Sequence, residues 1–564
     1  MKYPIILLVI FIIFSCNSST IIKSDAGDIT DTYNPGDIYS NIDSGRGDVE
    51  REEFWDQKSR IEIKGDFDKC SEIYTEKGSL REKAEYYDWA AKNIHLIKKK
   101  EYSLVHNILS KDDFPTSIQA DLKLQVEYYD DSDNHGLWSS LYVASQAFRY
   151  LVTGSRDALE NLNRSYRGLY NLFLISGAKG LPARDFRDNS IAGYECPSNA
   201  DAYKKPVNRS GNTYVKIDSE GCLMYFDTDQ SQMRYDEPKI CVDKKFSDMC
   251  FKRNTSKDEI AGHLFASAII YRFISEPELR GMAQELLTDM ALHLINNDFV
   301  LKDYDGMKTK YGSFYALSLD EHPGFNALGA LSVIRSGLVA SQREDIYRSY
   351  YQCLLQQNGV HKCIRQPVEY DSPRDYREYL KDDIGILMDC KNINYDNVNI
   401  VFLNFFSYIT FLGNETDRRE VKSYFIENTS KPDGSGRYLW YQYNPHFNFI
   451  ILSLMEDSDN IQIEVIRRIY REALCALKRF PKTNIKRFID NSQKYSAVCT
   501  NSNGDTFADS IIAIEDRCPH EFVWWMDPFK IRICEENRRF AFNPAGYLLP
   551  YWMGRYFGFI SEED

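Results

Sequence analysis

The sequence lacks the short motifs that mark several large enzyme classes. No GxGxxG follows a predicted strand, and no P-loop GxxxxGK[ST], HExxH helix or GxSxG nucleophile elbow is present. The cysteines show no CxxC spacing, which is the usual signature of a structural zinc site. The sequence therefore gives no support to nucleotide-dependent, zincin or α/β-hydrolase chemistry, and we expect neither a metal nor another cofactor.

Clustered positive charge is also scarce. The formal net charge is -14, from 69 Lys and Arg against 83 Asp and Glu, and the run Lys98-Lys99-Lys100 is typical of a solvated helix end. Because phosphate binding requires clustered Lys and Arg, we expect no nucleic-acid partner. The hydrophobic fraction of 43% and the aromatic fraction of 14% indicate a globular protein with one large core or two ordinary ones.

The one long apolar run stands at the N-terminus, from Ile5 to Phe14, and Ser15-Cys16 follows it. This run is too short to span a bilayer, which takes about 20 apolar residues, and its pattern is typical of a secretory signal peptide. The cysteine after Ser15 resembles a bacterial lipobox. We therefore expect 1–16 to be a lipoprotein signal peptide, with a lipid on Cys16 that attaches the protein to a membrane of the bacterial cell envelope, facing the periplasm or the cell surface. Plain secretion and an uncleaved anchor are the alternatives.

Export also bears on the cysteines. The chain has 13 Cys, and an even number remains after Cys16, which favours disulfide bonds in an oxidising compartment. The close pairs are Cys241/Cys250, Cys353/Cys363 and Cys518/Cys534, and we expect a local bond between Cys241 and Cys250. Cys475 lies in an apolar helical run and is predicted to be a free core thiol.

The organisation of the chain changes after an N-terminal extension. Residues 17–80 are predicted to be a flexible tether and extension, and 81–564 a helical domain. Helical periodicity gives five pairs of helices: Trp138–Val152 with Arg156–Ser176, Ile260–Ile274 with Pro277–Asn296, Asn326–Val339 with Glu344–Leu355, Asn397–Leu412 with Asp417–Glu427, and Phe447–Met455 with Gln462–Ala476. A sixth pair would come from Arg81–Lys99, Ser117–Tyr128 or Tyr547–Phe559.

This pattern favours an all-α fold, an (α/α)6 toroid, over an irregular helical bundle or an α-solenoid, because no repeat motif recurs. Short strands are expected at Tyr214–Ile217, Phe299–Lys302 and Phe529–Ile533. A Cys-rich loop insertion at about 185–257 interrupts the helices, and long loops of this kind are often functional.

The strongest catalytic candidates stand at the start of one predicted helix. Ser256 and Glu259 have the spacing of a capping box, and Asp258 and His263 lie close to them. Two carboxylates and a histidine at a helix mouth are able to supply general acid and base groups, although capping with a satisfied histidine explains the same residues.

Similar helix mouths provide the other candidates. Catalytic roles are also predicted for Tyr311, Glu321 and Glu521, and substrate binding for Asp133, His135, Trp138, Arg184, Asn399, Asn444, His446 and Trp524. If the helices close a toroid, alternate loops meet at one end, and we expect Asp258, Glu259, His263, Tyr311, Glu321, Asn399, His446 and Glu521 to line one cavity.

Several stretches carry a resemblance to a known group. They are His135 to Tyr142, Gln146 to Tyr150 with Thr153-Gly154, Gly180 to Arg184, Asp258 to His263 and Leu548 to Tyr556. Over roughly residues 80–560 the chain resembles uncharacterised exported bacterial proteins that are similar to six-hairpin glycosidases. The resemblance implies an α/α toroid and, by analogy of fold, carbohydrate chemistry. It transfers no catalytic residue, and the Cys-rich insertion departs from it.

These observations lead to one expectation of function and one alternative. We expect a carbohydrate-active lipoprotein of the envelope that acts on a polysaccharide or oligosaccharide as a glycoside hydrolase or a polysaccharide lyase. In a hydrolase Glu259 would be the acid, with Asp258, Glu321 or Glu521 as its partner. In a lyase Tyr311 or His263 would be the base, and Arg184 or Asn399 would neutralise the uronate. The alternative is a non-catalytic surface lipoprotein that binds a glycan or a protein.

Overall fold

The computed structural model describes residues 79–97, 100–130, 132–206, 211–318, 322–341, 344–359, 363–364, 374–382, 395–432, 437–455 and 461–562. All of these residues belong to one compact unit, Lys58–Asp564. The predicted signal peptide, Cys16 and most of the predicted tether therefore lie outside the described residues, as does Glu321.

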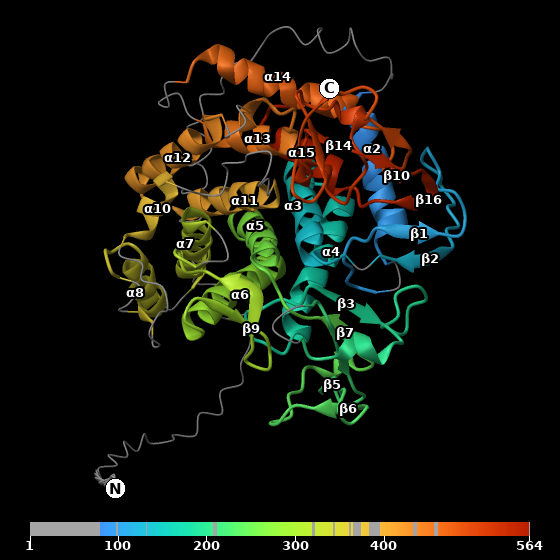
Figure 1. Cartoon of the computed structure of the whole chain (residues 1–564), viewed down its shortest axis with the longest axis vertical. Coiled ribbons are helices and arrows are strands. Elements are labelled where there is room, and N and C mark those ends of the chain that lie inside the picture. The colour runs from blue at the N-terminus through green and yellow to red at the C-terminus, as the bar shows by residue number, and fades with distance from the viewer. Residues whose placement is uncertain are drawn as a thin grey trace, which may run out of the picture. The chain divides into compact units, whose positions relative to one another are not determined.

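One group of helices is buried along most of its length. It comprises α3 (His135–Thr153), α5 (Lys257–Phe273), α7 (Pro323–Ala340), α11 (Tyr395–Phe411), α13 (Pro445–Leu454) and α15 (Ala545–Tyr556). Helices that are apolar on every side belong in a core. Contacts run from α3 through α5, α7, α11, α13 and α15 and return to α3 (Figure 1).

A second group of helices packs against the first. It comprises α2 (Leu80–Ala90), α4 (Arg156–Ile175), α6 (Pro277–Asn296), α8 (Glu344–Leu354), α10 (Tyr376–Asp382), α12 (Glu415–Ser430) and α14 (Ile463–Arg479). The contacts are α2 on α15, α4 on α3, α6 on α5 and α7, α8 on α7, α10 on α7 and α12, α12 on α11, and α14 on α13. The five predicted pairs of helices are all present, and no described helix is long and apolar enough to cross a membrane.

The fold is not all-α, because several antiparallel sheets accompany the helices. One has the order β10-β16-β1-β2, with β10 Ile485–Lys486, β16 Asn537–Ala541, β1 Ile108–Ser110 and β2 Val126–Tyr129. The segment Ser117–Tyr128 is therefore not a helix. Small sheets join β11 (Ile489–Asp490) to β15 (Ile533–Cys534), β8 (Val300–Lys302) to β9 (Lys308–Ser313), and β12 (Ala497–Thr500) through β13 (Thr506–Ala508) to β14 (Lys530–Ile531).

The Cys-rich insertion is an ordered sheet. Its order is β3-β7-β4-β5-β6, with β3 Asp185–Asp188, β7 Met249–Lys252, β4 Tyr214–Ile217, β5 Leu223–Asp227 and β6 Gln232–Tyr235. Disulfides join Cys196 to Cys250 and Cys222 to Cys241. The expected Cys241–Cys250 bond is therefore wrong. Cys222 faces Cys241 across an antiparallel bridge, whereas Cys250 lies within β7.

The remaining described cysteines are also oxidised. Cys353 bonds Cys363, and Cys518 bonds Cys534, as their spacing predicts. Cys475 on α14 and Cys499 on β12 are disulfide-bonded as well. The prediction of a free core thiol at Cys475 is therefore wrong: an apolar helical run does not reveal which residues pack on it from elsewhere in the chain.

Candidate functional site

A cavity of about 550 Å³ opens at the N-terminal ends of α3 and α11. The C-terminal strands and loops complete its wall, because segments far apart in the sequence meet there (Figure 1). Its lining residues are Ser132, Asp133, Asn134, Trp138, Tyr395, Asp396, Asn501, Asn503, Asp505, Phe507, His520, Glu521, Trp525, Met526, Asp527, Lys530 and Arg532. Carboxylates and aromatic rings dominate this set, and sites that bind sugars combine the same two kinds of group.

Aromatic side chains form one side of the cavity. The indole of Trp138 meets the edge of Trp525, with ring centroids 5.1 Å apart, and stacks on Phe522 at 6.4 Å. Its Nε1 donates a hydrogen bond to Ser132 Oγ at 2.9 Å, which fixes the plane of the ring. Trp138 and Trp525 are each about 5% exposed, so they present a small, rigid apolar surface to a ligand.

Asp396 is a carboxyl group of the cavity lining whose pKa is strongly raised. It stands in the first turn of α11, open to the cavity, but the surrounding walls desolvate it and raise its pKa to about 6. The negative charge of Asp258 also raises this pKa, while a hydrogen bond from Trp525 and the charges of Lys530 and Arg532 lower it. A carboxyl group with a pKa near 6 is poised to donate a proton near neutral pH.

A second carboxylate, Glu521, is paired with the neighbouring imidazole. His520 Nδ1 accepts a hydrogen bond from the Phe522 N–H at 3.3 Å, so the proton of the neutral ring lies on Nε2. Nε2 is 3.2 Å from Glu521 Oε2. Burial lowers the pKa of His520 and keeps the ring neutral. The Nε2–H of the neutral imidazole therefore lies beside the Glu521 carboxyl group.

The other carboxylates of the lining already have cationic partners. Lys252 Nζ lies 3.1 Å from Asp133 Oδ1, Lys530 Nζ lies 2.6 Å from Asp505 Oδ2, and Arg437 Nη1 lies 3.5 Å from Asp527 Oδ1. These pairs leave Asp396 and Glu521 as the lining carboxylates without a lysine or arginine partner within 4 Å among the described residues. The cavity therefore offers two carboxyl groups for chemistry that no lysine or arginine already pairs.

Glu259 and His263, which the sequence favours as catalytic groups, lie in the protein interior and not at the cavity surface. Both side chains are fully buried in α5, and burial raises the pKa of Glu259 well above its usual range. His263 Nδ1 hydrogen-bonds to the carbonyl oxygen of Glu259 at 2.8 Å, and burial lowers its pKa to about 4. Neither residue lines the cavity. Asp258, one position earlier, is half-buried and lies 3.5 Å from the Asn134 side chain.

The expected capping box at this helix does not form. Ser256 makes no side-chain cap bond to α5, and Glu259 turns inward toward α3. A Cβ on Gly136 would lie only 2.2 Å from Glu259 Oε2, so the glycine makes room for the buried carboxyl group. A complete capping box is instead present at Ser79 and Glu82, at the start of α2.

Two predicted substrate-binding residues hold the loop before α3 in place and are not part of the cavity lining. Arg184 is 5% exposed and donates from Nη1 to Asp133 O and to Asn134 Oδ1, both at 2.7 Å. His135 is buried between Asp185 Oδ1 at 3.0 Å and Val105 O at 2.9 Å. Both residues therefore position the loop and do not face the cavity.

The other predicted residues do not line the cavity either. Asn399 and Trp524 are fully buried, and they donate to Tyr395 O at 3.0 Å and Gly546 O at 2.6 Å. Asn444 caps α13 by accepting from the Phe447 N–H at 3.2 Å. His446 is buried beside Phe522, which lowers its pKa to about 3. Tyr311 is exposed on β9. Of the predicted set, the structure gathers Asp133, Trp138 and Glu521 in one cavity.

Sequence reasoning gave no role to Asp396 or Arg532. The motif Asp396-Asn397-Val398-Asn399 stands at a helix mouth, which is a signal for Asp396. No sequence signal brings Arg532 to the same cavity, because it follows a two-residue strand and reaches the site through tertiary packing.

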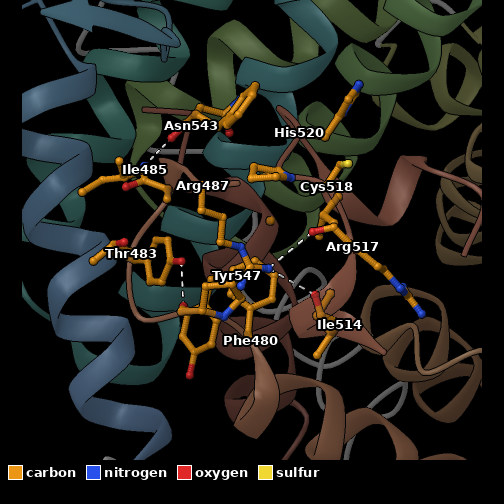
Figure 2. Close-up of a pocket in the computed structure, with 17 residues that line it drawn as sticks. Phe480, Thr483, Ile485, Arg487, Ile514, Arg517, Cys518, His520, Asn543 and Tyr547 are labelled. Carbon is orange, nitrogen blue, oxygen red and sulfur yellow. Dashed lines mark hydrogen bonds between the residues drawn. The ribbon is translucent and has the colours of Figure 1, made fainter. Parts of the chain in front are cut away.

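Two further cavities lie elsewhere. Figure 2 shows the smaller one, of about 40 Å³, in which Arg487 donates to the carbonyl oxygens of Ile514 and Arg517, each at 3.4 Å. His520 lines both this space and the cavity of about 550 Å³ that contains Asp396. A third cavity, of about 630 Å³, lies among α2, α15 and the C-terminal end of α3. There Asp88, whose pKa burial raises to about 6, accepts hydrogen bonds from Gln146 and Trp552 and pairs with Arg149.

Solved structures that are loosely similar to this chain include two GH9 proteins. No protein-family model matches the sequence, and no curated protein does. GH family 9 endoglucanase J30 is 10% identical, with a TM-score of 0.36, over 86% of this chain and 84% of that chain. Bacteroides ovatus GH9 is 10% identical, with a TM-score of 0.32, over 91% of this chain and 83% of that chain.

Proposed function

We propose that this protein is a carbohydrate-active enzyme of the bacterial cell envelope. It cleaves a glycosidic bond in the cavity of about 550 Å³, with Asp396 as the general acid. The observation that carries the proposal is the Asp396 carboxyl group itself. It is open to a cavity lined by two indoles, and its pKa is raised to about 6. General acids of glycosidases need such a raised pKa, because they must hold a proton at the working pH.

The proposed chemistry uses the two carboxyl groups that have no lysine or arginine partner within 4 Å. Asp396 gives its proton to the glycosidic oxygen as the bond from that oxygen to the anomeric carbon breaks. Glu521, whose Oε2 lies 3.2 Å from His520 Nε2, takes a proton from the water that attacks the anomeric carbon. The water oxygen becomes the new hydroxyl group of one product, and the proton from Asp396 completes the hydroxyl group of the other. Trp138 and Trp525 provide the surface on which a sugar ring stacks.

This assignment moves the acid from Glu259 to Asp396. Glu259 is fully buried under Gly136, so a substrate has no access to it. The lyase alternative has less support, because His263 is buried and Tyr311 lies on β9, away from the cavity lining. Arg184 and Asn399, expected to neutralise a uronate, hydrogen-bond to the chain itself.

We also propose that the two groups of helices are the inner and outer layers of an (α/α)6 toroid. The support is the order of contacts, which returns from α15 to α3, together with the burial of α5, α7, α11 and α13. In such a fold the N-terminal ends of the inner helices point to one end of the ring. Asp133, Asp258 and Asp396 stand at three such ends, which is why residues so far apart in sequence lie near each other.

The cellular location remains part of the proposal. Its support is the sequence Ile5 to Cys16, which has the pattern of a lipoprotein signal peptide. A lipid on Cys16 would hold the enzyme on a membrane, and residues 17–80 would let the folded domain reach polysaccharides at the periplasmic or outer surface.

The test compares two matched carboxyl-to-amide substitutions on a broad panel of polysaccharides and oligosaccharides. Asp396→Asn removes the proposed acid, and we expect a loss of about 100- to 10,000-fold in kcat, the usual contribution of a general acid. Glu259→Gln is the control, because it changes a buried carboxyl group that does not face the cavity. Full activity of Asp396→Asn, or a comparable loss in Glu259→Gln alone, would overturn the assignment.

The rival function is a non-catalytic surface protein that binds a glycan or a protein partner. A paired set of acidic and aromatic groups in a cavity of about 550 Å³ favours the enzyme over a flat binding surface. The same panel separates the two, since binding without release of new reducing ends on every positive glycan would establish the binder. Products that carry a carbon–carbon double bond, seen by their ultraviolet absorbance, would instead establish a lyase.

A further inference from the structure

Arg532 lines the same cavity of about 550 Å³, and no neighbouring carboxylate matches its positive charge. Lys530, two residues earlier, already pairs with Asp505 at 2.6 Å. No Asp or Glu oxygen among the described residues lies within 4 Å of the Arg532 guanidinium, although the group is half-buried. The cations behind the lining, Lys252 and Arg437, are each within 4 Å of an aspartate.

The hydrogen-bonding capacity of this guanidinium is also largely unused within the protein. An arginine side chain carries five N–H donors. Within the described residues, the hydrogen bond of the Arg532 side chain is a weak one, from Nη1 to the thioether sulfur of Met526 at 3.8 Å. The backbone, by contrast, is fixed, because the Arg532 N–H donates to Asn491 Oδ1 at 2.8 Å. The side chain is thus held at the cavity by its backbone while its donors remain available to a ligand.

Without an anionic ligand, the charge of the partly buried Arg532 guanidinium is energetically unfavourable at this position. Burial lowers the pKa of Arg532 from its usual value, while the charges of Asp505, Asp527 and Asp396 act against this from a distance. Asp505 and Asp527 are already committed to Lys530 and Arg437. A partly desolvated charge gains most from a partner that is both anionic and bidentate, and a guanidinium matches the two oxygens of a carboxylate or a sulfate.

We propose that Arg532 binds an acidic group of the substrate, so that the cavity takes an acidic glycan, one that carries carboxylate or sulfate groups on its sugars. The inference rests on the proposed function only in naming a glycan as the ligand. Arg532 and Asp396 line the same cavity, so the acidic sugar would lie at or next to the bond that is cleaved. Lys530 would contribute little, because Asp505 neutralises it.

The test measures binding in the Asp396→Asn background, so that no turnover is needed. Isothermal titration uses oligosaccharides of galacturonic acid, the same chains after reduction of their carboxyl groups, sulfated oligosaccharides and neutral cello-oligosaccharides. We expect an acidic series to bind, and Arg532→Ala to weaken that binding about 10- to 100-fold, the range for a lost charge-assisted pair. Arg532→Lys should recover part of the affinity. Tighter binding of the uronate or of the sulfated series identifies the acidic group.

Arg538→Ala is the matched control, because Arg538 is exposed on β16, its side chain pairs with Asp113 at 3.4 Å, and its loss changes the net charge by the same amount. We expect it to leave binding unchanged, and circular dichroism to show that Arg532→Ala is folded. Equal affinity for acidic and neutral chains, no binding of any acidic series, or an equal loss in both arginine variants would each overturn the proposal. Binding of an acidic chain without cleavage by the native protein would refute the enzyme and leave the Arg532 site standing.

Discussion

The indole of Trp138 meets the edge of the Trp525 indole at 5.1 Å, and the second of these rings also hydrogen-bonds to Asp396. Trp138 lies in the first turn of α3, and Trp525 lies in a short 3-10 helix near the C-terminus. The aromatic surface and the proposed acid are therefore one connected unit, and a change in the ring alters the proton affinity of the carboxyl group.

The pH dependence of activity follows from that connection. Activity should fall as Asp396 loses its proton, around pH 6. Trp525→Phe removes a hydrogen bond that favours the carboxylate, so the pKa rises and the descending limb of kcat/KM moves to higher pH. Asp258→Asn removes a negative charge that raises the pKa, so the limb moves to lower pH. Shifts in the same direction for both variants would contradict the assignment of this limb to Asp396.

Stability should depend on the protonation of the same group, and in the same direction as activity. The pKa of Asp396 is about 6 in the folded protein and about 3.9 in an unfolded chain, so the folded state binds more protons between these values. The contribution of Asp396 to stability is therefore present below pH 4 and is lost as the pH rises through 6. Asp396→Asn should raise Tm at pH 7 and have little effect near pH 4. Differential scanning calorimetry at the two pH values measures it, and a lower Tm at pH 7 would contradict it.

Gly136 should be intolerant of a side chain. A Cβ there would lie 2.2 Å from Glu259 Oε2 and 2.6 Å from His263 Cε1, and both side chains are fully buried. Gly136→Ala should destabilise the fold by about 1–3 kcal/mol through overpacking. Gly281→Ala in α6 is the control, because nothing lies within 4 Å of its added Cβ. That variant should be more stable by about 0.5–1 kcal/mol. Chemical denaturation of both variants decides whether the predicted contrast holds.

The disulfide pairing of the insertion is directly measurable. Non-reducing peptide mapping should find Cys196 bonded to Cys250 and Cys222 bonded to Cys241. Replacement of both Cys222 and Cys241 by serine should lower the free energy of unfolding by about 3 kcal/mol in the loop-entropy model, because the closed loop has a separation of 19 residues. A Cys241–Cys250 peptide in protein from the native host would refute the pairing.

Lipid attachment at Cys16 gives the last prediction. Acyl chains gain about 0.8 kcal/mol per buried CH₂ group, so a lipidated chain should sediment with membranes. Cys16→Ser should leave an uncleaved precursor or a mislocalised protein without the lipid. Mass spectrometry of the native N-terminus checks it, and a mature chain that begins at another residue without an acyl mass would show ordinary secretion.

The helices were predictable because their signals are local. Pro277 at the first position and a regular apolar spacing define α6, whose predicted bounds Pro277–Asn296 match the structure. The strands of the insertion are four or five residues long, and their pairing depends on partners dozens of residues away, as for β3 with β7. Local periodicity carries no information on such pairing, so the segment was expected to be a loop apart from one strand at Tyr214–Ile217, which matches β4.

The site was less predictable than the fold, because adjacent residues of a helix point about 100° apart around its axis. Asp258 and Glu259 are neighbours with similar chemistry, yet one is half-buried at the helix mouth and the other is fully buried. The sequence places both at the start of α5 but does not determine the rotation of the helix about its axis. Arg532 depends on the packing of C-terminal strands against α3 and α11, which is a property of the whole chain.

The central place of β1 has a consequence for how the chain is made. β1 lies between β2 and β16, and Lys83 near the start of α2 donates to the carbonyl oxygen of Phe480 at 2.7 Å. A ribosome makes β16 and α15 after β1 and α3, so the sheet and the contact of α15 with α3 stay incomplete until these two elements are made. A nascent chain of this protein therefore has no finished core before their synthesis, and folding completes only afterwards.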